Sequence, residues 1–381
     1  MKRFLISLCI LLLVLPGTPS LAEAGSDSPV DLPQLGAYGL YDCATGACLT
    51  GKDVEGLHPV AGVSRLPALV TLAQAFDDGS IREDATLQVS PRAAGIPGPT
   101  AFLSENETIQ AEPLLKAGVM ISAGDAITAL YEHAYGSENV FLENIAVTLK
   151  EAGVDMAMTD ALGTGMAFSC NSLFQIGRAA ANSPAYTKYS CLYLDQIRHG
   201  DGRETELVSA NRMVRFFAGC DGLLTGSSQT DGYSGVFHAV RNDMELICVI
   251  IGAKNSQDRS SAAEALFQYG FSNFTVKHLA KEGNVFVPAL PVRSGDRKTV
   301  NLVAKEPISV LREKNAGKLV EEREVPEYLE APLSEDTPVG EIRYVDENGS
   351  IHATIPLYPD SPVARFGLLD ILLKILSDFS H

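Results

Sequence analysis

The chain has 381 residues, of which 47 are Asp or Glu and 30 are Lys or Arg, so its formal net charge is −17 at pH 7. This balance argues against a nucleic-acid-binding protein, because contacts with a phosphate backbone require clustered Lys and Arg side chains. Apolar residues make up 46% of the chain, which is enough for packed cores. The length is typical of two domains.

The first 24 residues have the pattern of a secretory signal peptide. Lys2 and Arg3 precede an apolar run from Phe4 to Leu15, and small residues follow around positions 20–24. The run is too short for a transmembrane helix, which needs roughly 20 apolar residues. We therefore expect an exported, extracytoplasmic protein.

Residues 36–50 predict a β-hairpin, because apolar segments flank a turn at Thr45 and Gly46. Residues 63–76 follow with apolar residues at helical spacing. Pro67 lies inside this segment, where proline costs a helix interior about 3 kcal/mol. We expect this helix to be kinked or to begin near Pro67.

The middle of the chain predicts helices followed by strands. The clearest helical patterns cover residues 113–135 and 137–152, and Gly153 is placed to end the second. Strands are expected at 222–225, 232–240 and 245–252, and a closing helix at 259–269. The apolar run within the last strand is typical of a buried central strand. Together with the hairpin, these segments predict an α/β domain over residues 30–278 whose sheet joins the two ends of that domain.

Short β-branched segments separated by Pro, Gly and charged residues follow Phe274. They predict strands at 299–304, 308–311, 339–345 and 352–357, in a small all-β domain over residues 283–357. Residues 356–362 are rich in proline and are expected to form a hinge.

Residues 358–381 are expected to contain an amphipathic C-terminal helix. From Phe366 to His381, the polar residues fall on one narrow arc and apolar residues cover the rest. Such a helix suits a membrane surface, although interfacial helices usually carry more Lys and Arg. The alternative is packing on the protein itself or on a dimer partner.

Cysteine placement suggests one disulfide. An exported chain permits disulfides, and Cys43 and Cys48 flank the expected hairpin turn, so they could face each other across the strand pair. The remaining cysteines are scattered, and no histidine pair with zinc-site spacing accompanies them. We therefore expect no metal and no cofactor.

Several segments along the chain match one family pattern. They are residues 41–49, 121–126, Asn211, 221–226, 249–253, Arg259, 330–332 and 339–342. On these segments the chain resembles the serine D-alanyl-D-alanine carboxypeptidases, which are low-molecular-mass penicillin-binding proteins. The resemblance implies a β-lactamase/transpeptidase-like domain with a central antiparallel sheet and helices, followed by a small all-β C-terminal domain.

The family's chemistry is acyl transfer by three motifs. In Ser-x-x-Lys the two residues lie one helical turn apart, so the amine can take the serine proton and an acyl-enzyme can form. Ser-x-Asn supplies a relay hydroxyl and an amide that holds the substrate. Lys-Thr-Gly on an edge strand holds the substrate carboxylate and offers an N–H to the oxyanion.

The first motif is degenerate in this chain. Alignment puts Ala61 at the nucleophile and Ser64 at the general base, and nowhere after the signal segment does a Ser precede a Lys by three residues. Ser64 itself is followed at this spacing by Pro67, so it is either a lone nucleophile or a helix-capping or polar filler residue. His58 lies nearby in the sequence and is either a base or a surface histidine.

The other two motifs are also altered. Ser122 is retained in the second, but Gly124 replaces its Asn; Leu224 replaces the Lys of the third. The retained features would shape a substrate groove, with backbone N–H groups at positions 61 and 227 available to an oxyanion. These groove residues are Ser122, Thr225, Gly226 and Ser227.

Three functions follow from a complete fold with an altered site. The leading hypothesis is a non-catalytic protein that binds peptidoglycan stem peptides or docks onto cell-wall synthesis proteins. The alternative is an active serine-type D-Ala-D-Ala carboxypeptidase that uses Ser64 or Ser122 and trims pentapeptide stems. A purely structural partner of an active homologue is the third. Attachment to the outer face of the cytoplasmic membrane would come from the C-terminal helix.

Overall fold

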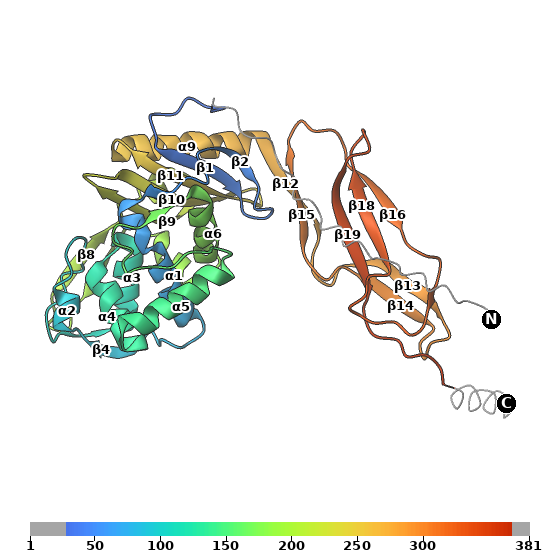
Figure 1. Ribbon diagram of the computed structural model, residues 1–381, viewed down its shortest axis with the longest axis horizontal. Coiled ribbons are helices and arrows are strands. Elements are labelled where there is room, and N and C mark those ends of the chain that lie inside the picture. The colour runs from blue at the N-terminus through green and yellow to red at the C-terminus, as the bar shows by residue number, and fades with distance from the viewer. Residues whose placement is uncertain (1–27, 368–381) are drawn as a thin grey trace, which may run out of the picture.

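The computed structural model describes residues 28–367 (Figure 1). The expected signal peptide and the apolar part of the C-terminal helix lie outside the described residues. Within residues 28–367, no helix is both long enough and apolar enough to cross a membrane. Figure 1 shows an α/β unit beside an elongated all-β unit, which confirms the predicted fold class.

The first unit is built on a five-stranded antiparallel sheet with the order β2-β1-β11-β10-β9. Its strands are β1 (Ala37–Asp42), β2 (Cys48–Lys52), β9 (Cys220–Ser228), β10 (Gly232–Arg241) and β11 (Met244–Ala253). The apolar run in β11 is fully buried at the centre of the sheet, as predicted. Because β1 pairs with β11, the sheet joins the two ends of this unit.

Helices cover both faces of the sheet (Figure 1). On one face lies α9 (Ser256–Asn273), which is longer than expected because Asn255 caps it by accepting a hydrogen bond from the Asp258 N–H. On the other face lie α1 (Leu66–Asp77) and α6 (Cys170–Ala181), within the larger apolar core. Pro67 lies in the first turn of α1, as expected from its missing N–H.

The helix predicted over residues 113–135 is wrong in one respect, because it is two helices. They are α3 (Ala111–Ile121) and α4 (Gly124–Tyr135), and between them Ser122 has a φ of 55°. A residue in the left-handed conformation cannot continue an α-helix, so the chain turns at Ser122. The corner between α3 and α4 borders the groove described below. The next helix, α5 (Glu138–Glu151), agrees with prediction and is capped by Ser137.

Shorter elements complete this unit. They are β3 (His58–Pro59), η1 (Ala61–Arg65), β4 (Thr86–Gln88), α2 (Pro91–Ala94), β5 (Thr108–Gln110), β6 (Ala167–Phe168), α7 (Pro184–Ser190), β7 (Leu194–Arg198), β8 (Glu204–Val208) and α8 (Met213–Phe216). Of these, η1 and the β7–β8 hairpin form parts of the groove described below.

The second unit is all β. Its strands are β12 (Phe274–Ala280), β13 (Val285–Arg293), β14 (Thr299–Val303), β15 (Ile308–Glu313), β16 (Val320–Glu324), β17 (Leu329–Glu330), β18 (Gly340–Val345) and β19 (Ile351–Pro359). Six form one sheet in the order β16-β18-β19-β14-β13-β17, while β12 pairs with β15. The four predicted strands are present. The hinge predicted at 356–362 is wrong up to Pro359, because β19 continues through it.

The disulfide predicted between Cys43 and Cys48 is not formed in this structure, where both residues are free thiols. An irregularity in the β1–β2 ladder pairs Cys48 with Tyr41 rather than with Cys43. Cys43 therefore lies past the last paired residue of the hairpin and faces other strands.

Candidate active-site groove

A groove with a volume of about 760 Å³ lies where η1, the α3–α4 corner, β9 and the β7–β8 hairpin meet. It contains most of the site residues predicted from the sequence. Those that line it are Ala61, Ser64, Ser122, Thr225, Gly226 and Ser227. Gly124 and Leu224 do not, and both lie buried beside it.

Ala61, which the sequence comparison predicts at the nucleophile position, has an unusual backbone conformation. Ala61 begins η1 with a φ of 49°, a conformation that costs a non-glycine residue about 1 kcal/mol or more. Ser64, at the base position, is buried and donates a hydrogen bond of 3.1 Å from its hydroxyl to the Leu162 carbonyl. Ser64 therefore holds a wall of the groove, which agrees with the polar-filler interpretation.

The strand β9 approaches η1 too closely for any side chain at position 226. A Cβ atom added to Gly226 would lie 2.6 Å from the backbone nitrogens of both Gly62 and Val63. Glycine is thus required here because two backbones meet. This contact sets the spacing between the first and third motif positions.

Arg65 is a site residue that the sequence reasoning missed. Its guanidinium donates a short hydrogen bond to the Ser122 carbonyl, and burial lowers its pKa. A Cβ atom on Gly124 would lie 3.5 Å from Arg65 Nη1 and 2.7 Å from Ile96 Cγ2. The space into which an asparagine at 124 would project is therefore occupied. A basic residue directly after position 64 was the only signal in the sequence.

The charged groups that line the groove are arginines and one aspartate. Among the described residues that line it there is no lysine and no histidine, and the charged ones are Arg65, Arg212, Arg259 and Asp231. His58, which the sequence offered as a base, instead contacts Asp53 at 2.7 Å and does not line the groove. A serine hydroxyl here would have no amine or imidazole to take its proton.

The Ser122 hydroxyl is buried and has no hydrogen-bond partner among the described residues. Ser122 is also one of the residues that line the groove. Its backbone is held on the other side by Arg65, so this corner is fixed in position.

Arg259 holds together the segments on the β9 side of the groove. Its guanidinium donates to the carbonyls of Gly226, Ser234 and Ala210 at 3.4, 3.3 and 3.1 Å. Burial lowers its pKa to about 10, so it stays cationic at neutral pH. Its role in this structure is to tie β9, β10 and the segment before α8 together.

Leu224, which is predicted to stand at the lysine position of the third motif, is an apolar core residue. Its side chain is buried in the larger core, and its strand partner across the sheet is Val236. The lysine position of the motif therefore contributes packing and no charge to the groove.

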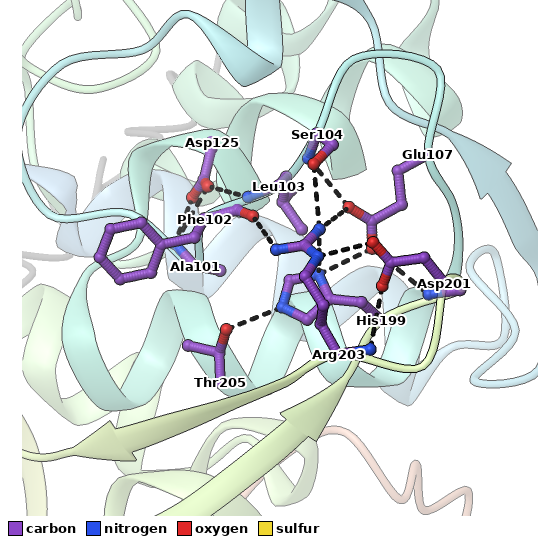
Figure 2. Close-up of polar contacts among 11 residues, drawn as sticks. Ala101, Phe102, Leu103, Ser104, Glu107, Asp125, His199, Asp201, Arg203 and Thr205 are labelled. Carbon is purple, nitrogen blue, oxygen red and sulfur yellow. Dashed lines mark hydrogen bonds and ion pairs between the residues drawn. The ribbon is translucent and has the colours of Figure 1, made fainter.

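A buried polar network supports the groove from the side of residues 99–107 (Figure 2). Asp125, at the start of α4, accepts hydrogen bonds from the Ala101 and Leu103 N–H groups. Next to it Gly124 donates to the Pro99 carbonyl at 2.9 Å. The segment that contains the groove-lining Pro99 is therefore tied to the α3–α4 corner.

The same network reaches the β7–β8 hairpin. Glu107 contacts His199 Nδ1 at 2.7 Å and Arg203 Nη2 at 3.2 Å, and both carboxylate and imidazole are almost fully buried. His199 Nε2 contacts the Thr205 hydroxyl at 2.8 Å. Figure 2 shows these side chains converging from the loop and the hairpin. Because Tyr193 and Val208 at the hairpin base line the groove, the network fixes its second wall.

Residues 31–255 match the D-alanyl-D-alanine carboxypeptidase family, and residues 274–365 match the C-terminal domain of penicillin-binding protein 5. The chain belongs to the D-alanyl-D-alanine carboxypeptidase family. Membership confirms the resemblance seen in the sequence.

Known relatives resemble this chain over nearly its whole length. D-alanyl-D-alanine carboxypeptidase DacF of Bacillus subtilis is 24% identical over 388 residues, which cover 100% of this chain and 99% of the relative. DacC of Escherichia coli is 26% identical over 344 residues, 84% of this chain and 82% of the relative.

Solved structures share the fold. Penicillin-binding protein 5 of Haemophilus influenzae superposes with a TM-score of 0.77 at 22% identity, covering 88% of this chain and all of that one. A peptidoglycan synthesis regulatory factor (PBP3) of Streptococcus pneumoniae superposes with a TM-score of 0.66, also at 22% identity, over 86% of this chain and 99% of that one. Both structures therefore share the fold of this chain.

Proposed function

We propose that this protein is a non-catalytic member of the family that binds peptide stems of peptidoglycan in its groove. One observation carries the proposal: the groove is open and well supported, yet alanine occupies the nucleophile position and no described lining residue is a lysine or histidine. Losing the nucleophile of a serine hydrolase costs on the order of 10⁶ in turnover. A groove of this kind retains shape for binding without the means for acylation.

The charge of the groove favours an anionic ligand. Three arginines and one aspartate line it, although the chain as a whole is strongly acidic. Arg65 and Arg259 donate to backbone carbonyls, whereas Arg212 is exposed and packs over the Phe216 ring. The guanidinium of Arg212 is available for a peptide carboxylate, which it can bind through two parallel N–H groups.

The location proposed for this activity is extracytoplasmic. Relatives across the family are named as D-alanyl-D-alanine carboxypeptidases, whose substrates are stem peptides in the wall. We propose a peripheral position on the outer face of the cytoplasmic membrane, with residues 368–381 at the membrane surface. The predicted helix is wrong over 358–365, because β19 continues to Pro359 and Val363 is buried in the core of the second unit. Docking onto cell-wall synthesis proteins is the version of the proposal that remains if no peptide binds.

An active serine carboxypeptidase is the competing function, and Ser122 is the observation in its favour. Its buried hydroxyl has no hydrogen-bond partner among the described residues, and Ser122 lines the groove. Against it stands the absence of a lysine or histidine among the described lining residues. Arg65, which is bound to the Ser122 carbonyl, stays protonated and cannot take the serine proton.

A binding titration that also records turnover separates these functions. The purified protein is titrated with a synthetic pentapeptide stem that ends in D-Ala-D-Ala, and released D-alanine is measured in the same samples. We expect saturable binding without D-alanine release. The Arg212→Ala variant should bind several-fold more weakly, whereas Arg82→Ala, an exposed arginine paired with Asp84, should bind normally.

The other outcomes are equally informative. Binding too weak to measure at millimolar peptide removes the peptide ligand and leaves protein docking. Release of D-alanine that Ser122→Ala abolishes would establish the carboxypeptidase instead.

A further inference from the structure

A row of polar side chains crosses one end of the five-stranded sheet. Alternation along the strands directs Val236, Ile247 and Tyr41 into the larger core, so residues two positions away on each strand share that face. Those residues are His238 on β10, Glu245 on β11 and Cys43 just after β1. Cys43 is held next to Glu245 by a backbone hydrogen bond of 2.9 Å from its N–H to the Glu245 carbonyl.

The three side chains converge on one point. The Cys43 sulfur, a His238 ring nitrogen and a Glu245 carboxylate oxygen all lie within 4.8 Å of one another. His238 Nε2 and Glu245 Oε2 are 3.9 Å apart. A tetrahedral zinc ion with bonds of about 2.0–2.3 Å places its ligand atoms roughly 3.3–3.7 Å apart. Contraction of about 1 Å, within the freedom of side chains at a sheet end, would close this triangle around an ion.

Two features of the His238 imidazole favour binding of a metal ion. His238 is only 4% exposed, and its Nε2 has no hydrogen-bond partner among the described residues. A buried, unpaired ring nitrogen is costly unless something binds it. On the other side, Nδ1 contacts the Asp221 carboxylate of β9 at 2.6 Å. A carboxylate behind a histidine is the usual outer-shell partner of a zinc ligand, because it fixes the tautomer that leaves Nε2 free.

We propose that Cys43, His238 and Glu245 form a binding site for a divalent transition metal, with zinc as the ion that this set of sulfur, nitrogen and oxygen donors fits best. None of the three residues lines the groove, so the site is independent of the proposed function. The bound ion would join β1, β11 and β10 at the end of the sheet.

An ion can reach this site from solvent. The Glu245 side chain is 53% exposed and Cys43 is half-buried, so the open side of the triangle faces outward. Water can fill the fourth position.

Zinc and cobalt titrations of the purified, reduced protein test the site. We expect one zinc ion per chain by mass spectrometry under native conditions, and cobalt(II) should give a near-ultraviolet thiolate charge-transfer band. The variants Cys43→Ser and Glu245→Gln should each weaken zinc binding by more than about tenfold, and Cys43→Ser should abolish the charge-transfer band. Asp221→Asn should weaken binding by about tenfold, because it acts through His238.

Matched variants and folding measurements keep the outcome interpretable. Cys191→Ser removes an exposed thiol elsewhere and should change nothing. Glu245 is exposed, so Glu245→Gln should keep the circular dichroism spectrum and unfolding temperature of the parent. Absence of zinc binding, or binding that survives Cys43→Ser and Glu245→Gln, would overturn the proposal. So would recovery of Cys43 in a disulfide with Cys48, because a bridged sulfur offers no thiolate.

Discussion

The groove and the polar network behind it differ in how their key positions are occupied. In the groove, the positions that we predict for the nucleophile, base, amide and lysine hold Ala61, Ser64, Gly124 and Leu224. In the network, Asp125, Glu107 and His199 are buried and fully engaged with the segments that they hold. The difference teaches that the shape of the groove is built by residues other than those that would do chemistry in it. A chain can therefore lack the catalytic residues and still keep the residues that shape the groove.

The largest effect is expected from breaking the network. Glu107 is 4% exposed on its side chain and is the shared partner of His199 and Arg203. The variant Glu107→Ala should lower the free energy of unfolding by about 3 kcal/mol, because it leaves a fully buried imidazole without its partner. Urea denaturation measures the loss.

Glu204, an exposed carboxylate on β8, serves as the control for Glu107. Glu204 pairs with Arg198 on the surface of the β7–β8 hairpin. Glu204→Ala should cost less than about 1 kcal/mol, as exposed ion pairs usually do. Equal losses from the two variants would contradict the view that the network holds the groove walls.

The next effect concerns the spacing of β9 and η1. A Cβ atom at Gly226 would meet two backbone nitrogens at 2.6 Å, so Gly226→Ala should force the strand away and lower the free energy of unfolding by about 2 kcal/mol. Gly62→Ala is the matched variant, because its added Cβ would lie 3.5 Å from Gly226 Cα, an ordinary contact. Thermal unfolding should separate the two. A larger effect at Gly62 would show that the close approach is not what fixes this position.

A smaller effect is expected from restoring the missing amide. In Gly124→Asn the new side chain would meet Ile96, so we expect a loss of about 1 kcal/mol in unfolding free energy. Adding Ile96→Ala should make the combined loss smaller than the sum of the single losses, because it opens the space that the asparagine needs. Strict additivity in this double-mutant cycle would show that Ile96 does not fill the amide position.

The smallest effect is expected from restoring the nucleophile alone. Ala61→Ser adds a hydroxyl at the correct position but no base, so it should not form an acyl-enzyme with penicillin. Intact-mass measurement after prolonged incubation checks this. An adduct on the introduced hydroxyl would mean that the groove supplies a base that the static geometry does not reveal.

Much of the fold was predictable because it rests on local patterns. The hairpin, the central strand 245–252, the helix after Ser137 and the four strands of the second unit all follow from apolar periodicity and turn residues. The break between α3 and α4 was not predictable, because it depends on the left-handed backbone at Ser122, which no local propensity of serine requires.

The sequence could predict which residue types occupy the site. It could not predict which residues from distant parts of the chain contact one another there. The predicted replacements at positions 61, 124 and 224 come from the sequence alone. Arg65 was missed because its partner, the Ser122 carbonyl, is 57 positions away. The metal ligands were missed for the same reason: Cys43 is far along the chain from His238 and Glu245, so no ligand spacing exists to be recognised.

Incubation of the unaltered protein with a fluorescent penicillin, followed by a denaturing gel and intact mass, tests the central claim most directly. The geometry predicts no covalent adduct, because Ala61 offers no nucleophile and the described lining residues offer no lysine or histidine as base. A stoichiometric adduct would contradict this account and would identify a working serine carboxypeptidase, with the labelled peptide naming its nucleophile.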